Sequence, residues 1–327
     1  MLWLMIAAVV GCAGHGRELV RRGDEIVVAG RYFHTGAPVV LWTDPGGYDA
    51  YRVERRFVPL DKASWEATAA EGKGPESPNR YGWRKADLPP DVVERVRGGG
   101  WDLETLRGVV DQFVIHYDVC GTSRQCFRIL HDVRGLSVHF MLDLDGTIYQ
   151  TLDVKERAWH AGTANDRGVG IEIANIGAYP PATDGAELPP TLARWYAKDE
   201  AGRWRVTLPS SLGDGGLRTP GYIARPARNG PVIGRIHGQS LMMFDLTDAQ
   251  YESLIRLTAT LHRALPRIRL DAPRDAGGAL RMDALSEDEM AAYSGLLGHH
   301  HVTKGKIDPG PAFDWERVIT GARRLVR

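Results

Sequence analysis

Residues 298–315 read GHHHVTKGKIDPGPAFDW. This stretch places three histidines, two lysines and an aspartate ahead of a Pro-Gly-Pro turn. A polar, turn-rich segment of this kind is either a solvated surface loop or part of a site whose other residues lie elsewhere in the chain. Because imidazole and carboxylate groups are common zinc ligands, the second interpretation directs attention to histidines upstream.

The composition is that of an ordinary globular protein. The chain has 327 residues, 43% of them hydrophobic, which is enough for one large domain or two small ones. Lysine plus arginine equals aspartate plus glutamate at 41 each. No net charge would attract nucleic acid or an anionic membrane, so we expect no nucleic-acid partner.

The amino terminus, MLWLMIAAVVGCAGHG, has the pattern of an export signal. Its apolar run, residues 2–10, is too short to span a bilayer but suits a signal peptide. Residues 9–12 resemble a bacterial lipobox, which predicts lipidation of Cys12 and a periplasmic, lipid-anchored protein of the cell envelope. No basic residue precedes the run, so a misassigned start or a buried apolar strand is the alternative interpretation.

Two cysteines remain besides Cys12. In an oxidising compartment an even pair is expected to form a disulfide, here between Cys120 and Cys126. Two buried thiols are the alternative.

The first hundred residues are predicted to form an extension and a linker. Short β-rich runs fill residues 23–51, whereas residues 61–100 are polar and rich in glycine and proline, with one short helix over residues 91–97. We place a boundary near residues 98–100, after a signal segment over residues 1–20 and an extension over residues 21–100.

The remaining residues, 101–327, interleave strands with helices. The pattern predicts helical turns over residues 102–109 and two buried strands over residues 112–116 and 168–175. It also predicts one hairpin over residues 137–151, around Asp145-Gly146, and one capped helix over residues 247–265. Residues 178–240 are rich in proline and glycine and are interpreted as a long insertion. The fold class is therefore α/β or α+β, with a central sheet flanked by helices.

Three residues could complete a zinc site. His116 ends the strand QFVIH, while His299 and Asp308 lie nine positions apart on the opening stretch, far enough for a loop to present both. A catalytic zinc ion takes three protein ligands and keeps a fourth position for water. A single histidine at a strand end is more often a satisfied polar residue, so spacing alone leaves both interpretations open.

Five blocks resemble the zinc-dependent N-acetylmuramoyl-L-alanine amidase family, which also includes the peptidoglycan recognition proteins. In chain order they are FVIH (113–116), SVHFMLDLDGTIYQ (137–150), AWHAG (158–162), GVGIEI (168–173) and GHHHVTKGKIDPGPAFDW (298–315). The resemblance covers roughly residues 101–320 and implies a central mixed β-sheet. It also implies a Zn²⁺ cofactor and a peptidoglycan or muropeptide substrate.

Carried over by position, the resemblance implies His116, His299 and Asp308 as metal ligands. It also implies Lys306 and Glu172 as catalytic residues. Val138 occupies the place where one branch of the family has a tyrosine, so the sequence resembles the branch that uses a glutamate. Since loop length is not fixed by the motif, His300 and His301 remain alternatives to His299.

The implied reaction cleaves the amide between the lactyl group of N-acetylmuramic acid and L-alanine. Zinc lowers the pKa of water towards about 7, Lys306 polarises the carbonyl, and Glu172 moves the proton to the departing amine. His160 and Trp159 of AWHAG are expected at the substrate groove, although His160 could instead brace its loop. The paired Cys120 and Cys126 match a disulfide of the recognition proteins.

Two other functions compete with the amidase interpretation. Many recognition proteins bind peptidoglycan without cutting it, usually because a zinc ligand is missing, and this chain has every ligand position filled. A zinc peptidase that cuts within the stem peptide is the third alternative, which the order of Lys306 and the Asp-Pro-Gly-Pro segment disfavours.

Overall fold

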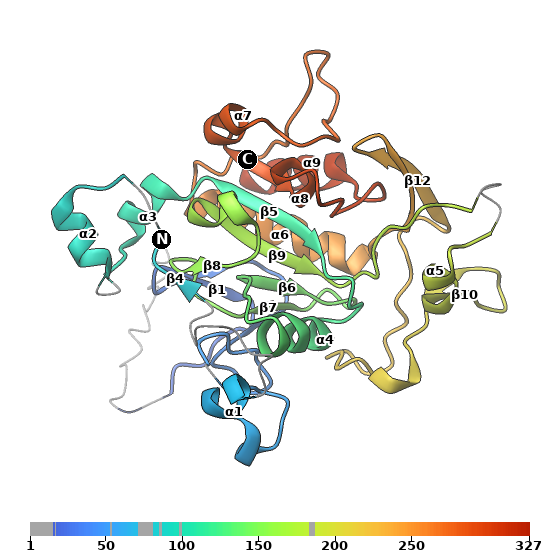
Figure 1. The fold of residues 1–327 in the computed structure, drawn as a ribbon, viewed down its shortest axis with the longest axis horizontal. Coiled ribbons are helices and arrows are strands. Elements are labelled where there is room, and N and C mark those ends of the chain that lie inside the picture. The colour runs from blue at the N-terminus through green and yellow to red at the C-terminus, as the bar shows by residue number, and fades with distance from the viewer. Residues whose placement is uncertain are drawn as a thin grey trace, which may run out of the picture.

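A six-stranded mixed β-sheet forms the centre of the molecule (Figure 1). The computed structural model describes residues 16, 18–52, 54–70, 81–84, 87–97, 100–182 and 187–327, so Cys12 and the apolar run of the predicted export signal lie outside the described residues. The strands are, in spatial order, β14 (Gly295–Gly298), β5 (Gln112–Tyr117), β9 (Gly168–Ile173), β6 (Phe140–Leu142), β7 (Ile148–Gln150) and β3 (Val39–Leu41). Only the β6–β7 pair is antiparallel. The predicted fold class, a mixed sheet flanked by helices, is confirmed.

The predicted hairpin is formed by β6 and β7. Its turn depends on Gly146, which has a positive φ of 83°. A Cβ atom there would also lie only 2.7 Å from the backbone oxygen of Ala249. A residue with a side chain is therefore excluded on two grounds, backbone conformation and space.

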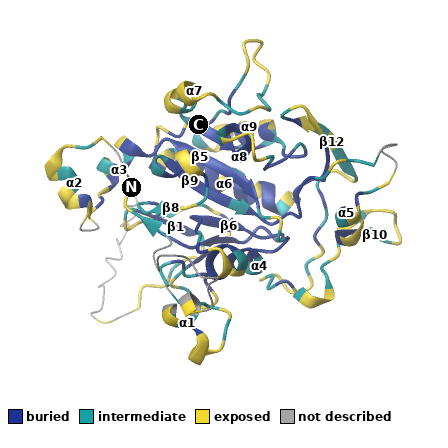
Figure 2. Cartoon of the chain, viewed as in Figure 1, coloured by how far each residue is buried: buried dark blue, intermediate teal, exposed yellow. Residues whose placement is uncertain are grey.

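Helices α6 (Asp248–Ala264) and α9 (Trp315–Val326) cover one face of the sheet. The predicted capping box at Thr247 and Gln250 begins α6. Phe113 and Ile115 of β5 pack into this core. Because side chains alternate along a strand, His116 projects from the opposite face. Figure 2 shows the central strands as buried.

The amino-terminal region is part of the same core. Strands β1 (Glu25–Val28) and β2 (Arg31–His34) form a hairpin, and β3 pairs with β7 at the sheet edge. The side-chain amide of Gln150 bonds both backbone groups of Val27, at 2.7 and 2.8 Å. The predicted β-rich extension therefore completes the sheet.

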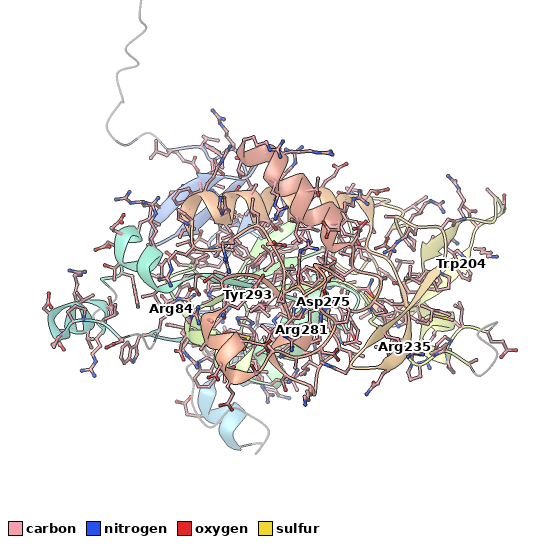
Figure 3. All side chains as sticks on the ribbon, turned by 90° about the horizontal axis from the view of Figure 1, so that it is seen from above. Arg84, Trp204, Arg235, Asp275, Arg281 and Tyr293 are labelled. Carbon is pink, nitrogen blue, oxygen red and sulfur yellow. The ribbon has the colours of Figure 1, made fainter. Side chains whose placement is uncertain are left out.

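Residues 81–84 connect this region to the middle of the chain. Strand β4 (Tyr81–Gly82) pairs antiparallel with β8 (Arg157–Ala158). The side chain of Arg84, labelled in Figure 3, is fully buried. The polar, glycine- and proline-rich composition of residues 61–100 predicts connecting structure here and indicates no role for Arg84.

The insertion over residues 178–240 has secondary structure of its own. It contains α5 (Pro190–Trp195), β10 (Tyr196–Lys198), β11 (Trp204–Val206), η4 (Ser210–Leu212) and β12 (Pro231–Ile236). Strand β12 pairs with β13 (Gln239–Phe244), and the ring of Phe244 stacks 3.9 Å from that of Tyr196, measured between centroids. The insertion's aromatic residues thus pack on the hairpin that follows.

The remaining helices are short. They are η1 (Leu60–Lys62), α1 (Trp65–Ala70), α2 (Pro90–Arg97), α3 (Leu103–Val109), α4 (Ser123–Phe127), η2 (Arg128–Val133), η3 (Gly162–Asp166), α7 (Glu287–Ala292) and α8 (His299–Val302). The predictions of α2 and α3 are confirmed. Across the described ranges, no helix has both the length and the apolar character needed to cross a bilayer.

Candidate active site

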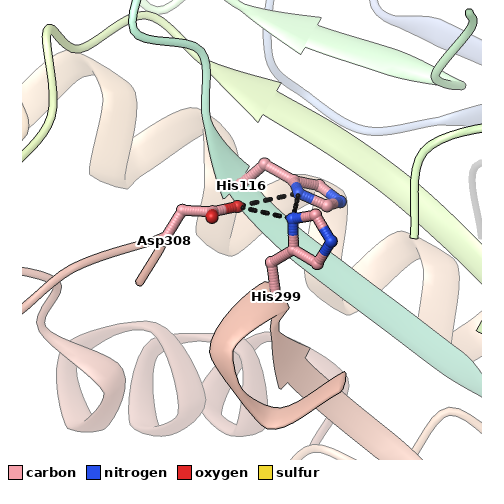
Figure 4. Close-up of side chains that lie close together, drawn as sticks. All are labelled: His116, His299 and Asp308. Atoms are coloured by element: carbon pink, nitrogen blue, oxygen red, sulfur yellow. Dashed lines mark hydrogen bonds and ion pairs between the residues drawn. The ribbon is translucent and has the colours of Figure 1, made fainter. Parts of the chain in front are cut away.

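Two imidazoles and one carboxylate converge at the end of β5 (Figure 4). Nδ1 of His116 lies 3.0 Å from Nδ1 of His299 and 2.9 Å from Oδ2 of Asp308. The third edge, from His299 Nδ1 to Asp308 Oδ2, is 3.1 Å. All three residues are buried. Three groups that can each donate an electron pair therefore face one point.

Strand pairing brings these residues together from distant parts of the chain. Strand β14 runs parallel to β5 with Gly298 opposite Ile115, so His299 follows the end of β14 beside His116. The loop after α8 then returns to the same point with Asp308. The parallel register thus explains why the Gly-His dipeptide and the strand-end histidine act as one unit.

The three consecutive histidines have different partners. His299 faces the cluster, whereas Nδ1 of His300 lies 3.0 Å from the backbone oxygen of Asp308. Nδ1 of His301 accepts the backbone N–H of Gly298 at 2.8 Å, and its Nε2 lies 2.7 Å from the backbone oxygen of Arg281. His300 therefore holds the loop that carries Asp308, and His301 braces the end of β14, so neither alternative to His299 faces the cluster.

Burial and neighbouring charges shape the electrostatics of the cluster. Burial is the main cause and the neighbouring His299 the second cause that together lower the pKa of His116 to about 4. Burial opposes ionisation of Asp308, but hydrogen bonds from His116 and His299 outweigh it and hold the pKa below its ordinary value. The set is therefore two imidazoles beside one ionised carboxylate.

Glu172 stands beside the cluster. It is the register partner of His116 in the β5–β9 pair, so both side chains project from the same face of the sheet. Within the described part of the chain, its Oε2 atom is buried and has no hydrogen-bond partner. Burial raises the pKa of Glu172 well above its ordinary value, Asp308 and Asp118 add to this effect, and Lys306 opposes it.

Lys306 is exposed at the rim of the cavity that His116, Glu172 and Asp308 line. Its backbone oxygen lies 2.9 Å from Nε2 of His237, a residue at the turn between β12 and β13. The insertion therefore contacts the lysine's loop directly. No local sequence pattern indicates a role for His237, because this contact joins residues 69 positions apart.

Of the two residues of the AWHAG segment predicted at the substrate groove, His160 lines the cavity and Trp159 does not. His160 lines the cavity, with its Nδ1 atom 2.9 Å from Nε2 of His116. Trp159 is 37% exposed and is not among the residues that line this cavity. His139 is completely buried: its Nδ1 accepts the backbone N–H of Gly170, and its Nε2 lies 2.9 Å from the backbone oxygen of Glu156.

The predicted disulfide is not formed in this structure. Cys120 and Cys126 are both free thiols in the cavity wall. They interact nonetheless, because a hydrogen bond with Cys120, together with burial, raises the pKa of Cys126 well above its ordinary value. The loop after β5 is held instead by Oδ1 of Asp118, which accepts the backbone N–H groups of Cys120 and Gly121, each at 2.9 Å.

Residues 106–200 match the family model described as N-acetylmuramoyl-L-alanine amidase. This part of the chain is similar to that amidase family. The matched segment contains His116, His160 and Glu172. Two members of the cluster, His299 and Asp308, lie outside the matched segment, as does Lys306. The fold brings all three beside it.

Individual relatives are distant. The chain is 22% identical over 237 residues to the 1,6-anhydro-N-acetylmuramyl-L-alanine amidase AmpD of Haemophilus influenzae, covering 72% of this chain and 78% of that protein. Among solved structures, a selenomethionine derivative of AmpD has 19% identity and a TM-score of 0.32, covering 76% of this chain and 90% of its own. The substrate complex of the Escherichia coli amidase AmiD has 18% identity and a TM-score of 0.34, covering 65% and 57%.

Proposed function

We propose that this protein is a zinc-dependent N-acetylmuramoyl-L-alanine amidase that hydrolyses the amide between N-acetylmuramic acid and L-alanine in peptidoglycan. The observation that carries the proposal is the meeting of His116, His299 and Asp308 beside Glu172 and Lys306 around one cavity. The match of residues 106–200 to the amidase family model supports the choice of reaction.

The three converging groups suit zinc. Their donor atoms are 2.9–3.1 Å apart, close to the roughly 3.3 Å edge of a tetrahedron with bonds of about 2.0–2.1 Å. Two imidazoles and one carboxylate would leave a net positive charge on the site. When bound, the ion would polarise the substrate carbonyl and lower the pKa of water.

The remaining residues supply proton transfer and charge stabilisation. Glu172 is placed to accept a proton from the attacking water and pass it to the departing amine of L-alanine. The Lys306 ammonium can approach the carbonyl oxygen and stabilise the negative charge that develops there. Cleavage then leaves a carboxylate on the lactyl group and a free amine on the stem peptide.

The relatives support a substrate class, and the amino-terminal pattern supports a location. The name of AmpD specifies an anhydro-muropeptide amide, and the AmiD complex holds an anhydro-muropeptide. We therefore propose peptidoglycan or its muropeptide fragments as substrate. The apolar run and the lipobox-like residues 9–12 support a location in the bacterial cell envelope, with lipid on Cys12.

Replacing Lys306 by methionine tests the proposal. Release of free stem peptide from purified sacculi, and from soluble muropeptides, is expected to fall about a hundredfold or more, the usual cost of losing one charge-stabilising donor. Wild-type release is expected to stop with a chelator and return with zinc. Lys304→Met is the matched control, because Lys304 is exposed in the same loop and lies outside the cavity lining.

Tight binding of sacculi by zinc-loaded wild-type protein, without release of peptide, would contradict the amidase proposal. That result would identify the chain as a recognition module of the same fold. Cleavage within the stem peptide would identify a peptidase, and the two products differ in mass.

The pH dependence of kcat/KM should reflect the ionisation of the Glu172 carboxyl group. A carboxyl group acts as a base only when it is ionised, and burial raises the pKa of this one. As the pH is lowered, kcat/KM is therefore expected to fall with a midpoint above the ordinary glutamate pKa of about 4.3. Lys306 lowers the pKa of Glu172, so Lys306→Met should move this acid limb to higher pH. Residual activity of the variant, measured across the acidic and neutral range, checks the direction. An unmoved limb would assign it to another group.

A further inference from the structure

The amino-terminal region reaches the candidate active site through residues 81–84. Tyr81 pairs with Ala158 and Gly82 with Arg157, so β4 lies alongside the strand that leads into His160. These four residues precede the segment matched to the amidase family, which begins at residue 106.

Arg84 fixes the other end of the same segment. Its guanidinium group is 0% exposed. Nη1 donates to the backbone oxygens of Asn165, Asp166 and Gly168 at 3.2, 3.2 and 3.0 Å, and Nη2 donates to that of Val154 at 2.7 Å. One planar group thus joins the end of η3, the start of β9 and the chain before β8.

Asn165 connects Arg84 to the backbone of His160. Its backbone oxygen accepts from Arg84, and its side-chain oxygen accepts the backbone N–H groups of His160 and Ala161 at 3.2 and 2.7 Å. The residue therefore links the buried guanidinium to the turn that carries the imidazole.

His160 in turn contacts a member of the metal cluster. Since Nδ1 of His116 faces the cluster, its Nε2 atom would carry the proton and donate to Nδ1 of His160, 2.9 Å away. The ring of His160 lies against Gly170, where a Cβ atom would come within 2.5 Å of it. The imidazole is therefore confined between β9 and His116.

We propose that Arg84 is a positioning residue of the active site: it fixes the segment that holds His160, and His160 orients His116 for the metal. This inference rests on the proposed zinc site. It gives residues 81–84, which lie before the family segment, an indirect part in metal binding.

Arg84→Met removes all the hydrogen bonds of the guanidinium. Zinc affinity is expected to fall about tenfold to a hundredfold, the range for residues that orient metal ligands. We expect kcat to fall with it while KM stays constant, because Arg84 touches neither cavity nor substrate. Zinc affinity is measured by competition with a chromophoric chelator. The visible spectrum of the Co²⁺-loaded protein, which reports ligand geometry, is expected to change.

A double-mutant cycle tests the route through His160. Arg84→Met and His160→Ala should weaken metal binding by less together than the product of their separate effects, because both act on His116. Leu257→Ala, in the buried core on the other side of the sheet, controls for general loss of stability. It should lower the melting temperature while leaving zinc affinity and the Co²⁺ spectrum unchanged.

Wild-type affinity and an unchanged Co²⁺ spectrum in Arg84→Met would overturn the inference, as would independent effects in the cycle. Equal losses of affinity in Arg84→Met and Leu257→Ala at matched melting temperature would also overturn it. A wild-type protein that binds zinc without cleaving peptidoglycan contradicts the proposed reaction alone, since the metal measurements do not depend on turnover.

Discussion

Replacing Asp308 by alanine is expected to abolish zinc retention and lower amidase activity by about a thousandfold or more, because water without the metal has a pKa of about 15.7 instead of about 7. Asp308 is the only carboxylate of the cluster and contacts both histidines. Without it, two imidazoles would have to hold a divalent cation alone. Metal content after dialysis and release of stem peptide provide the two measurements.

Asp288→Ala is the control for this substitution. Asp288 is exposed on α7 and outside the cavity lining, so its loss should change neither metal content nor activity. Full activity in Asp308→Ala would rule out the metal-dependent mechanism. Full zinc content without activity would restrict Asp308 to a role in the reaction itself.

Glu172→Gln is expected to lower kcat about a hundredfold to ten thousandfold, the usual contribution of a general acid or base, without lowering the melting temperature. The amide keeps the shape of the carboxyl but cannot accept a proton. Burial disfavours the charged carboxylate, and Oε2 has no partner among the described residues, so the neutral amide removes an unfavourable buried charge. Steady-state kinetics and thermal unfolding together give both results.

Asp118→Asn should behave in the opposite way. Asp118 also lines the cavity, but its Oδ1 atom holds the backbone after β5. Loss of its charge should therefore reduce stability more than it reduces kcat. Similar profiles for the two variants would argue against a specific role for Glu172 in proton transfer.

Local patterns were sufficient to predict much of the fold. Residues close in sequence determine the Asp145-Gly146 turn, the Thr247–Gln250 capping box and the buried strands predicted over 112–116 and 168–175. Their positions could therefore be inferred from turn chemistry and periodicity. The family resemblance added the order of the motifs, and with it the three residues that meet in the cluster.

Contacts between residues far apart in the chain could not be predicted from local sequence patterns. Arg84 lies in a polar, proline-containing region, and nothing local indicates that its guanidinium is buried against residues about 80 positions away. His237 contacts Lys306 only because a hairpin folds over the loop. The predicted disulfide rests on the compartment and on the family resemblance, and neither determines whether two neighbouring thiol groups are oxidised.

The separation of the cluster along the chain links metal binding to folding. His116 is 183 residues from His299 and 192 residues from Asp308. A bound ion would act as a crosslink that closes a loop of more than half the chain. Closing that loop costs conformational entropy in the unfolded chain, whereas the native fold already holds its ends together. Free zinc would therefore shift the folding equilibrium towards the native state, and the candidate active site would exist only in chains whose two halves had already assembled.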